Sequence, residues 1–195
     1  RQPYRRMFSE LETTGGELKE QYPDDFKTVE SFIWALKEAC RARYKKAVNG
    51  DLQPMKAEAR FFLAGDRMSA YACLLRPENG GEEITLEEFL GDMHYEGIQY
   101  GILREDIQRE FGLGYFRIFP VARGKPPVAG EDGKVTELLQ RRKNMSLEVQ
   151  SGSQVDFKED AQLQPIRKGT VICLIRPPRE GVDGMDVTGQ ILPSP

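Results

Sequence analysis

Histidine and cysteine are scarce in this chain, which has one His and three Cys among its 195 residues. A structural zinc site needs paired Cys or His ligands at short spacing, and Cys40, Cys73 and Cys173 lie far apart, so we expect no metal site. An odd number of cysteines argues against a disulfide framework and fits the reducing cytoplasm. Each cysteine lies among apolar neighbours, as in YACLL and VICLI, which predicts buried small side chains rather than reactive thiols.

Long apolar runs and an excess of basic residues are absent as well. The longest apolar runs, such as FFLA and VICLI, are far shorter than the roughly 20 residues that cross a bilayer, so we expect no membrane insertion. The formal net charge is −3, which gives the chain no overall positive field to attract nucleic acid. Nucleic acid is therefore not an expected partner.

Recognised catalytic motifs are also missing. The sequence contains no nucleophile elbow, Walker loop or dinucleotide-binding fingerprint. His94 has acids nearby at Asp92 and Glu96, but nearness in sequence does not supply a proton-transfer partner, and a structural role is favoured. Asp183 and Asp186 could pair as metal-binding or glycosidase carboxylates, although short acids between glycines more often hold turns. We therefore expect no catalytic residue, no cofactor and no enzymatic activity.

Periodic apolar residues predict helices and a hairpin in the first half of the chain. A helix is expected from Phe26 to about Asn49, because apolar residues recur there at steps of three and four. Two β-like runs, Ala59 to Leu63 and Ser69 to Leu75, flank the turn-forming sequence AGDR and predict a hairpin.

A capping box marks the start of the next helix. Thr85 and Glu88 are spaced so that each side chain accepts a hydrogen bond from the backbone N–H of the other. Ile84 and Phe89 occupy the positions of a hydrophobic staple, and Gly97 ends the helix. The remaining expected elements are a helix at Leu103–Phe111 and strands at Tyr115–Val121, Lys134–Leu139, Leu147–Phe157, Thr170–Ile175 and Asp186–Leu192. The predicted class is α+β, with a helical and α/β N-terminal part followed by a β-rich part.

Several short motifs follow one another in a specific order from Ala59 to Leu192. A D-x-M-x-A strand end precedes a proline, a glycine-rich loop and a G-I-x-x-G-I turn, and VARGKPPVAGEDGKV, VDFKED and EGVDGMDVTGQIL continue the series. In this order they resemble the N-terminal region of the bacterial flagellar assembly protein A family, formerly a domain of unknown function. The matching positions, which we expect to be structural, are Asp66, Met68, Ala70, Pro77, Gly80, Gly81, Gly97, Ile98, Gly101, Ile102, Ala122, Gly124, Pro127, Gly130, Asp132, Gly133, Asp156, Gly169, Gly181, Gly184 and Gly189.

The resemblance also implies a division of the chain. Residues 1–57, which match no family motif, are expected to form a helical extension, and residues 58–122 an α/β subdomain of the hairpin and two helices. Residues 123–195 are expected to form a β-rich subdomain that leads toward a β-solenoid beyond residue 195. GEDGKV and IRKGTVICLI also resemble paired strands of lipoyl-like domains, which implies a barrel-sandwich-like shape. The Met-Lys tip of such carriers is missing, and likeness of fold does not carry their function.

The sequence and its resemblance lead to two candidate functions of different classes. The resemblance implies a non-enzymatic cytoplasmic scaffold or assembly-factor module whose partners are other proteins, among them flagellar or polar components. The alternative is a sensing domain for an anionic metabolite or nucleotide, held by the glycine loops near Arg176 and Arg179. We expect these loops to be turns, with positive φ at one or more of Gly181, Gly184 and Gly189, because PPREGVDGMDVTG offers an anion no helix N-terminus. The sequence predicts no particular oligomeric state.

Overall fold

The computed structural model describes residues 3–48, 53–138 and 167–195. These residues form two compact units, one from the residues up to Ala129 together with Gly181–Pro195, and one from the residues between Gly130 and Glu180. The predicted strand Leu147–Phe157 and the motif residue Asp156 lie outside the described residues.

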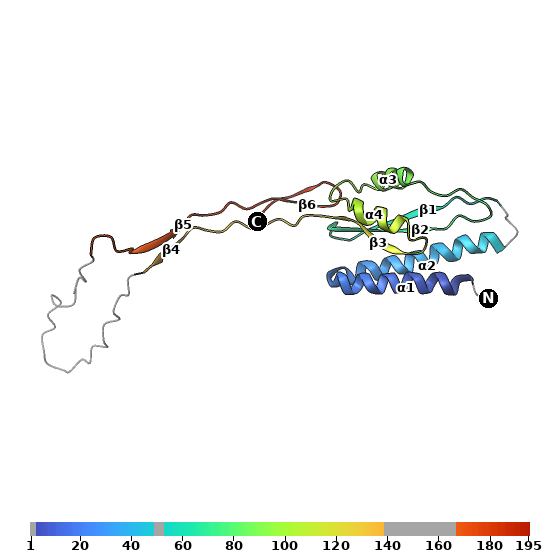
Figure 1. The fold of residues 1–195 in the computed structure, drawn as a ribbon, viewed down its shortest axis with the longest axis horizontal. Coiled ribbons are helices and arrows are strands. Elements are labelled where there is room, and N and C mark those ends of the chain that lie inside the picture. The colour runs from blue at the N-terminus through green and yellow to red at the C-terminus, as the bar shows by residue number, and fades with distance from the viewer. Residues whose placement is uncertain (1–2, 49–52, 139–166) are drawn as a thin grey trace, which may run out of the picture. The chain divides into compact units, whose positions relative to one another are not determined.

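A three-stranded antiparallel sheet forms the centre of the first unit (Figure 1). Its strands are β1 (Glu58–Leu63), β2 (Ser69–Leu75) and β3 (Ile118–Arg123), with β2 in the middle. Glu58 pairs with Leu75 at the open end of the first two strands, which confirms the predicted hairpin. Asp66 holds the turn of this hairpin, because its Oδ1 accepts a hydrogen bond from the Met68 amide at 2.9 Å.

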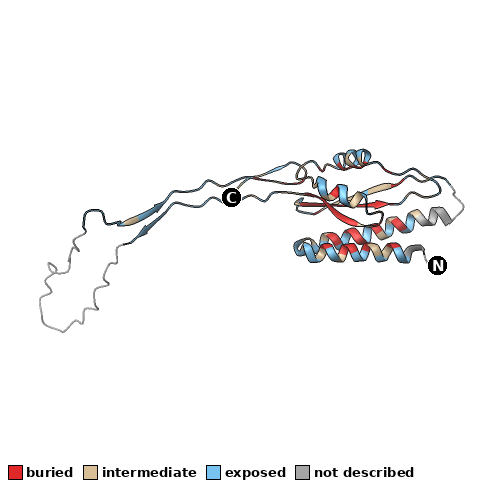
Figure 2. Cartoon of the chain, viewed as in Figure 1, coloured by how far each residue is buried: buried red, intermediate tan, exposed pale blue. Residues whose placement is uncertain are grey.

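Helices cover both faces of this sheet (Figure 1). The helices on one face are α1 (Pro3–Gln21), the short 3₁₀ helix η1 (Pro23–Asp25) and α2 (Phe26–Val48), and those on the other are α3 (Leu86–Tyr95) and α4 (Arg104–Phe111). Side chains of β2 alternate between the two cores, so that Tyr71 and Cys73 face the first helical layer while Ala72 and Leu74 face the second. Every residue of β2 is consequently buried (Figure 2).

The helix α1 lies within the helical extension expected for residues 1–57, although no apolar periodicity predicts its bounds, whereas α2 begins at Phe26 as expected. The middle of α1 reads TTGG, and threonine and glycine have low helix propensity. Gly15 lies against α2, where a Cβ atom would come within 2.5 Å of the Ile33 Cδ1 atom. Packing against α2, which buries Leu11 and Leu18, therefore stabilises a helix that local propensity disfavours.

The helix α3 begins with the predicted capping box. Thr85 Oγ1 accepts a hydrogen bond from the Glu88 amide at 3.2 Å, and the Glu88 carboxylate accepts one from the Thr85 amide at 2.9 Å. Ile84 and Phe89, the two residues of the predicted staple, both lie in the core. Gly97 follows the helix with a φ of +84°, the left-handed conformation that commonly ends helices.

Replacing Thr85 by alanine should lower the free energy of unfolding by about 1 kcal/mol. The change removes the side-chain acceptor of the Glu88 amide but leaves the ion pair between Lys56 and Glu88 in place. Urea unfolding of the variant and the parent measures the difference. Thr85→Ser is the control, because serine retains the hydroxyl group, and an equal loss in both variants would contradict the capping role.

The strand β3 begins later than predicted, at Ile118 rather than at Tyr115. Phe116 has a φ of +63°, which lies in the left-handed region and interrupts an extended chain. Its amide still donates to the Leu74 carbonyl at 2.8 Å, so the segment stays attached to β2. At the start of β3, the Ile118 amide donates to Thr14 Oγ1 of α1 at 3.1 Å, so the helix satisfies a donor of this edge strand.

The prediction of one strand over Asp186–Leu192 is wrong. The structure has a turn there, between the short paired strands β6 (Gly184–Met185) and β7 (Ile191–Leu192). Asp186 holds the turn, because its Oδ1 accepts hydrogen bonds from the amide and the hydroxyl of Thr188, at 2.9 and 2.7 Å. Thr188 and Ile191 have the β-branched side chains typical of strands, but this side-chain bonding determines the local conformation.

The second unit contains an antiparallel pair, β4 (Lys134–Glu137) and β5 (Cys173–Arg176), close to two of the predicted strands. Val135 and Ile175 face each other across this pair and are exposed. The α+β class is confirmed by the whole set of elements. The barrel-sandwich likeness is wrong for the described residues, because their sheets stay open and form no closed barrel.

Candidate functional site

A polar network joins the helical layer to the sheet in the first unit. Tyr71 of β2 donates its hydroxyl hydrogen to Asp25 Oδ2 of η1 at 2.5 Å. Arg123, at the end of β3, donates to the same oxygen at 2.5 Å and to the Tyr71 hydroxyl at 2.7 Å. Its guanidinium group also lies over the ring of Tyr22, 3.7 Å from the centroid. The network therefore fastens η1 to two strands at once.

The ionisation states of this network follow from its contacts. Burial by itself would raise the pKa of Asp25, but hydrogen bonds from Tyr71 and Arg123 outweigh it and hold that pKa below its usual value. Burial and the hydrogen bond to Asp25 raise the pKa of the Tyr71 hydroxyl. Burial lowers the pKa of Arg123, and the Asp25 carboxylate more than offsets that effect. The network is thus an ion pair bridged by a neutral phenol at neutral pH, which suits a structural tie rather than proton transfer.

Sequence reasoning missed this network. Asp25 lies just before α2, and its two partners lie 46 and 98 residues further along the chain. No local pattern connects residues at such separations. Correlated substitution of Asp25 and Arg123 among relatives is the signal that could have found the contact.

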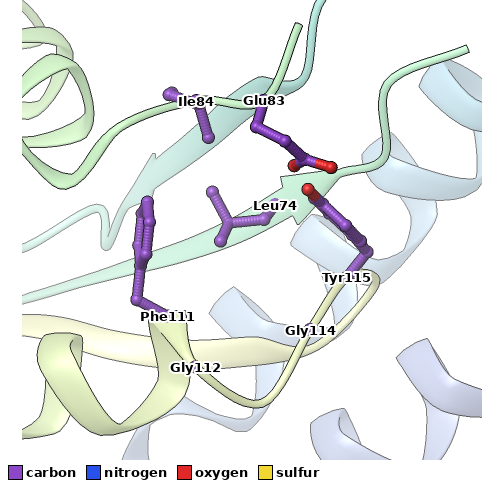
Figure 3. A pocket seen from close by; sticks show the side chains of 7 residues that line it. All are labelled: Leu74, Glu83, Ile84, Phe111, Gly112, Gly114 and Tyr115. Carbon is purple, nitrogen blue, oxygen red and sulfur yellow. The ribbon is translucent and has the colours of Figure 1, made fainter. Parts of the chain in front are cut away.

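A pocket of about 300 Å³ opens on the other side of the sheet, where β2 ends and α3 begins (Figure 3). Leu74, Ile84 and Phe111 form its apolar wall. The carboxylate of Glu83 and the hydroxyl of Tyr115 point toward one another at its other end (Figure 3). The pocket is therefore apolar at one end and carries a negative charge at the other. Sequence reasoning missed it, because its lining comes from three separate segments.

The family-motif positions are spread over both units. In the first unit lie Asp66, Met68, Ala70, Gly97, Gly101, Gly124, Pro127, Gly181, Gly184 and Gly189, and in the second lie Gly130, Asp132, Gly133 and Gly169, together with Arg176 and Arg179. Several of the glycines permit close approach of another backbone. A Cβ atom on Gly101 would lie 1.7 Å from the Arg123 carbonyl oxygen, and one on Gly184 would lie 2.4 Å from the Lys125 carbonyl oxygen. Gly101 and Gly184 therefore allow two backbone segments to pack closely.

Replacing Gly101 by alanine should lower the free energy of unfolding by about 2 kcal/mol. Gly101 has a φ of +67°, and the new Cβ would overlap the Arg123 carbonyl oxygen, so the backbone must move. Thermal or urea unfolding measures the loss. Gly91→Ala is the matched control, because Gly91 lies inside α3 with no heavy atom near its Cβ position, and alanine there should stabilise the helix. Equal effects at the two positions would contradict this assignment.

Residues 185–190 of the C-terminal glycine loop offer no backbone amide to an anion. The amides of residues 185–190 all donate to acceptors within the protein. Those acceptors are Lys125, Gln190, Arg67 and Asp186. Gly189 has a φ of +85°, as predicted for at least one glycine of this loop. Asp183, the other acid considered for a carboxylate pair, accepts a hydrogen bond from the Ser194 amide at 2.8 Å. Asp186 therefore holds a turn, and Asp183 joins the two ends of the β6–β7 pair.

Arg176 and Arg179, the candidate ligand contacts, lie in the second unit and are exposed. Arg176 stands opposite Lys134 in the β4–β5 register, and the backbone of Arg179 exchanges two hydrogen bonds of 2.9 Å with Glu131. The described residues contain no group of three or more His, Cys, Asp or Glu that could hold a metal ion. Within the same described ranges, none of the helices has the length and apolar character needed to cross a membrane.

The remaining candidates lie apart from one another. His94 is exposed on α3. Cys40 and Cys73 are buried, as predicted, whereas Cys173 is only half-buried. Burial raises the pKa of the Cys40 thiol to about 11, so this thiol stays protonated and unreactive at neutral pH.

Comparison with known families adds an independent observation. The profile of the flagellar assembly protein A N-terminal region matches residues 60–195. No curated protein and no solved structure matches the chain. The matched range begins within β1 and includes the whole second unit, and α1 and α2 precede it. The chain therefore belongs to the flagellar assembly protein A family, through that family's N-terminal region.

Proposed function

We propose that this chain is a non-enzymatic module of a cytoplasmic scaffold or assembly factor, and that it acts by binding other proteins, flagellar or polar components among them. The family match over residues 60–195 carries the proposal. The roles of the motif residues agree with it, since Gly101 and Gly184 permit close packing and Asp66 holds a turn.

Large exposed aromatic side chains give this proposal physical support. Trp34 on α2 is 68% exposed and Tyr95 on α3 is 91% exposed. Tryptophan and tyrosine are enriched at protein interfaces, where they supply much apolar contact area at low entropic cost. Both residues lie on regular helices, which would present them in fixed orientations.

Affinity capture of the tagged full chain from the source cell tests the proposal. We expect repeated recovery of flagellar or polar proteins, and reduced recovery with Trp34→Ala or Tyr95→Ala if these side chains contact a partner. Glu30→Ala is a control for Trp34, because Glu30 is an exposed residue of the same helix and its one ion pair among the described residues is with Lys19. Failure of the parent chain to enrich any such protein would contradict the proposal.

The alternative function, sensing of an anionic metabolite, has less support. The amides of residues 185–190 are all engaged, and Arg176 and Arg179 lie on open strand segments of the second unit. Thermal unfolding in the presence of nucleotides and sugar phosphates separates the two functions. A rise of several degrees with one compound, lost in Arg176→Gln or Arg179→Gln, would favour sensing.

A further inference from the structure

The pocket bounded by Leu74, Ile84, Phe111, Glu83 and Tyr115 combines an apolar wall with the side chain of an acid. Glu83 forms no ion pair with any described residue, although its carboxylate lies at the polar end of the pocket (Figure 3). The nearby Glu88 and Glu110 are both paired, with Lys56 and Arg117 respectively. Glu83 is therefore the acid at this pocket that lacks a cation.

The surroundings of Glu83 add to this negative charge. The segment 82–96 carries six acids and no lysine or arginine of its own, although Lys56 lies against it and pairs with one of the six, Glu88. The pocket also includes the C-terminal end of α4, where Gly112 caps the helix by donating to the Arg109 and Glu110 carbonyls. The carbonyl end of a helix carries partial negative charge and favours a cation. Both features select a positively charged group.

The pocket wall is also fixed in shape. Gly114 has a φ of +110° and Phe116 a φ of +63°, so the loop between α4 and β3 adopts a restricted conformation. The hydrogen bond from the Phe116 amide to the Leu74 carbonyl, at 2.8 Å, fastens this loop to β2. A preformed pocket reduces the entropic cost of binding.

We propose that this pocket receives an arginine side chain of a partner protein. The aliphatic stem of arginine would pack against Leu74, Ile84 and Phe111, while its planar guanidinium group would bond to Glu83 through two N–H groups. Tyr115 lies at the same end as Glu83 and supplies a ring on which the guanidinium could stack. This inference rests on the proposed function, since it names the chemistry by which the module recognises a protein partner.

A titration of the full ¹⁵N-labelled chain with Nα-acetyl-arginine N-methylamide tests the proposal. We expect saturable shifts of the Ile84, Gly112 and Gly114 amide signals at millimolar ligand. The citrulline analogue, which has the same shape but no charge, should bind at least tenfold more weakly. Glu83→Gln should weaken the binding of the arginine compound by a similar factor.

Glu87→Gln is the matched control, because Glu87 is an exposed acid on α3 that does not line the pocket. It should leave the titration unchanged. Any one of three results would overturn the proposal. These are equal binding of the citrulline analogue and the arginine compound, equal losses of binding in Glu83→Gln and Glu87→Gln, and no saturable shift up to tens of millimolar ligand.

The capture experiment with Glu83→Gln distinguishes this inference from the function on which it rests. If the variant recovers the same partners as the parent in the same amounts, the arginine pocket is wrong and the scaffold function stands. If the parent recovers no protein, the scaffold function fails, and the arginine-partner proposal fails with it even if the small compound binds. If the parent recovers partners and the variant loses them, both proposals are supported.

Discussion

Replacing Phe89 by alanine is expected to lower the free energy of unfolding by about 4 kcal/mol. Phe89 is fully buried on α3, and its ring centroid lies 5.1 Å from that of Phe61, 5.6 Å from that of Phe111 and 6.1 Å from that of Phe119. These neighbours belong to β1, α4 and β3, so they are held by three separate elements and cannot all move into the cavity. Chemical denaturation of the full chain measures the loss.

Tyr95→Ala provides the control for this experiment. Tyr95 is an aromatic residue at the end of the same helix, but its side chain faces solvent. Its removal should change the free energy of unfolding by less than about 0.5 kcal/mol. A loss at Phe89 no larger than that at Tyr95 would show that α3 does not pack on the sheet through this face.

Replacing Asp25 by asparagine should cost about 3 kcal/mol of stability at pH 7. The Asp25 side chain is only 13% exposed, and its loss of charge leaves the Arg123 guanidinium without a carboxylate. Arg123→Met should cost a similar amount, because it leaves the largely buried carboxylate without the guanidinium that pairs with it. The double variant should lose less than the sum of the two, since neither charge then remains without its partner. Strictly additive losses in urea unfolding would contradict a direct coupling.

The same network makes a prediction for acid stability. The pKa of Asp25 is lower in the folded protein than its ordinary value of 3.8. A carboxyl group with a depressed pKa stabilises the fold fully above its unfolded pKa, and this contribution is lost as the pH falls through the folded value. The difference in stability between the parent and Asp25→Asn should therefore stay constant from pH 7 to about 5 and shrink below about 4. A difference that grows toward low pH would contradict the assignment.

The elements that could be predicted from the sequence have all their determinants close together in the chain. Thr85 and Glu88 define the start of α3 through two hydrogen bonds within one helical turn. Asp66 defines the β1–β2 hairpin in the same local way. Such contacts form from neighbouring residues whatever the rest of the chain does, so composition and spacing are sufficient to find them.

The features that could not be predicted depend on contacts between distant segments. The helix α1 contains a TTGG sequence that disfavours helix, and it is stabilised by packing of Gly15 against Ile33. Asp25 meets Arg123 only after the sheet and the helical layer have assembled. The pocket at Glu83 likewise requires that α3, α4 and β2 come together. The periodicity of a single sequence contains no information about contacts between residues so far apart in the chain.

The central position of β2 has a consequence for any shortened version of this protein. A chain trimmed to the family match, starting at residue 60, would retain β2 but lose the helices that cover Tyr71, Cys73 and Leu75. None of these three side chains is more than 1% exposed in the intact protein. The trimmed chain would present them to water as a continuous apolar face, and such faces promote aggregation. The range that matches the family is therefore shorter than the range that must be expressed to give a soluble product.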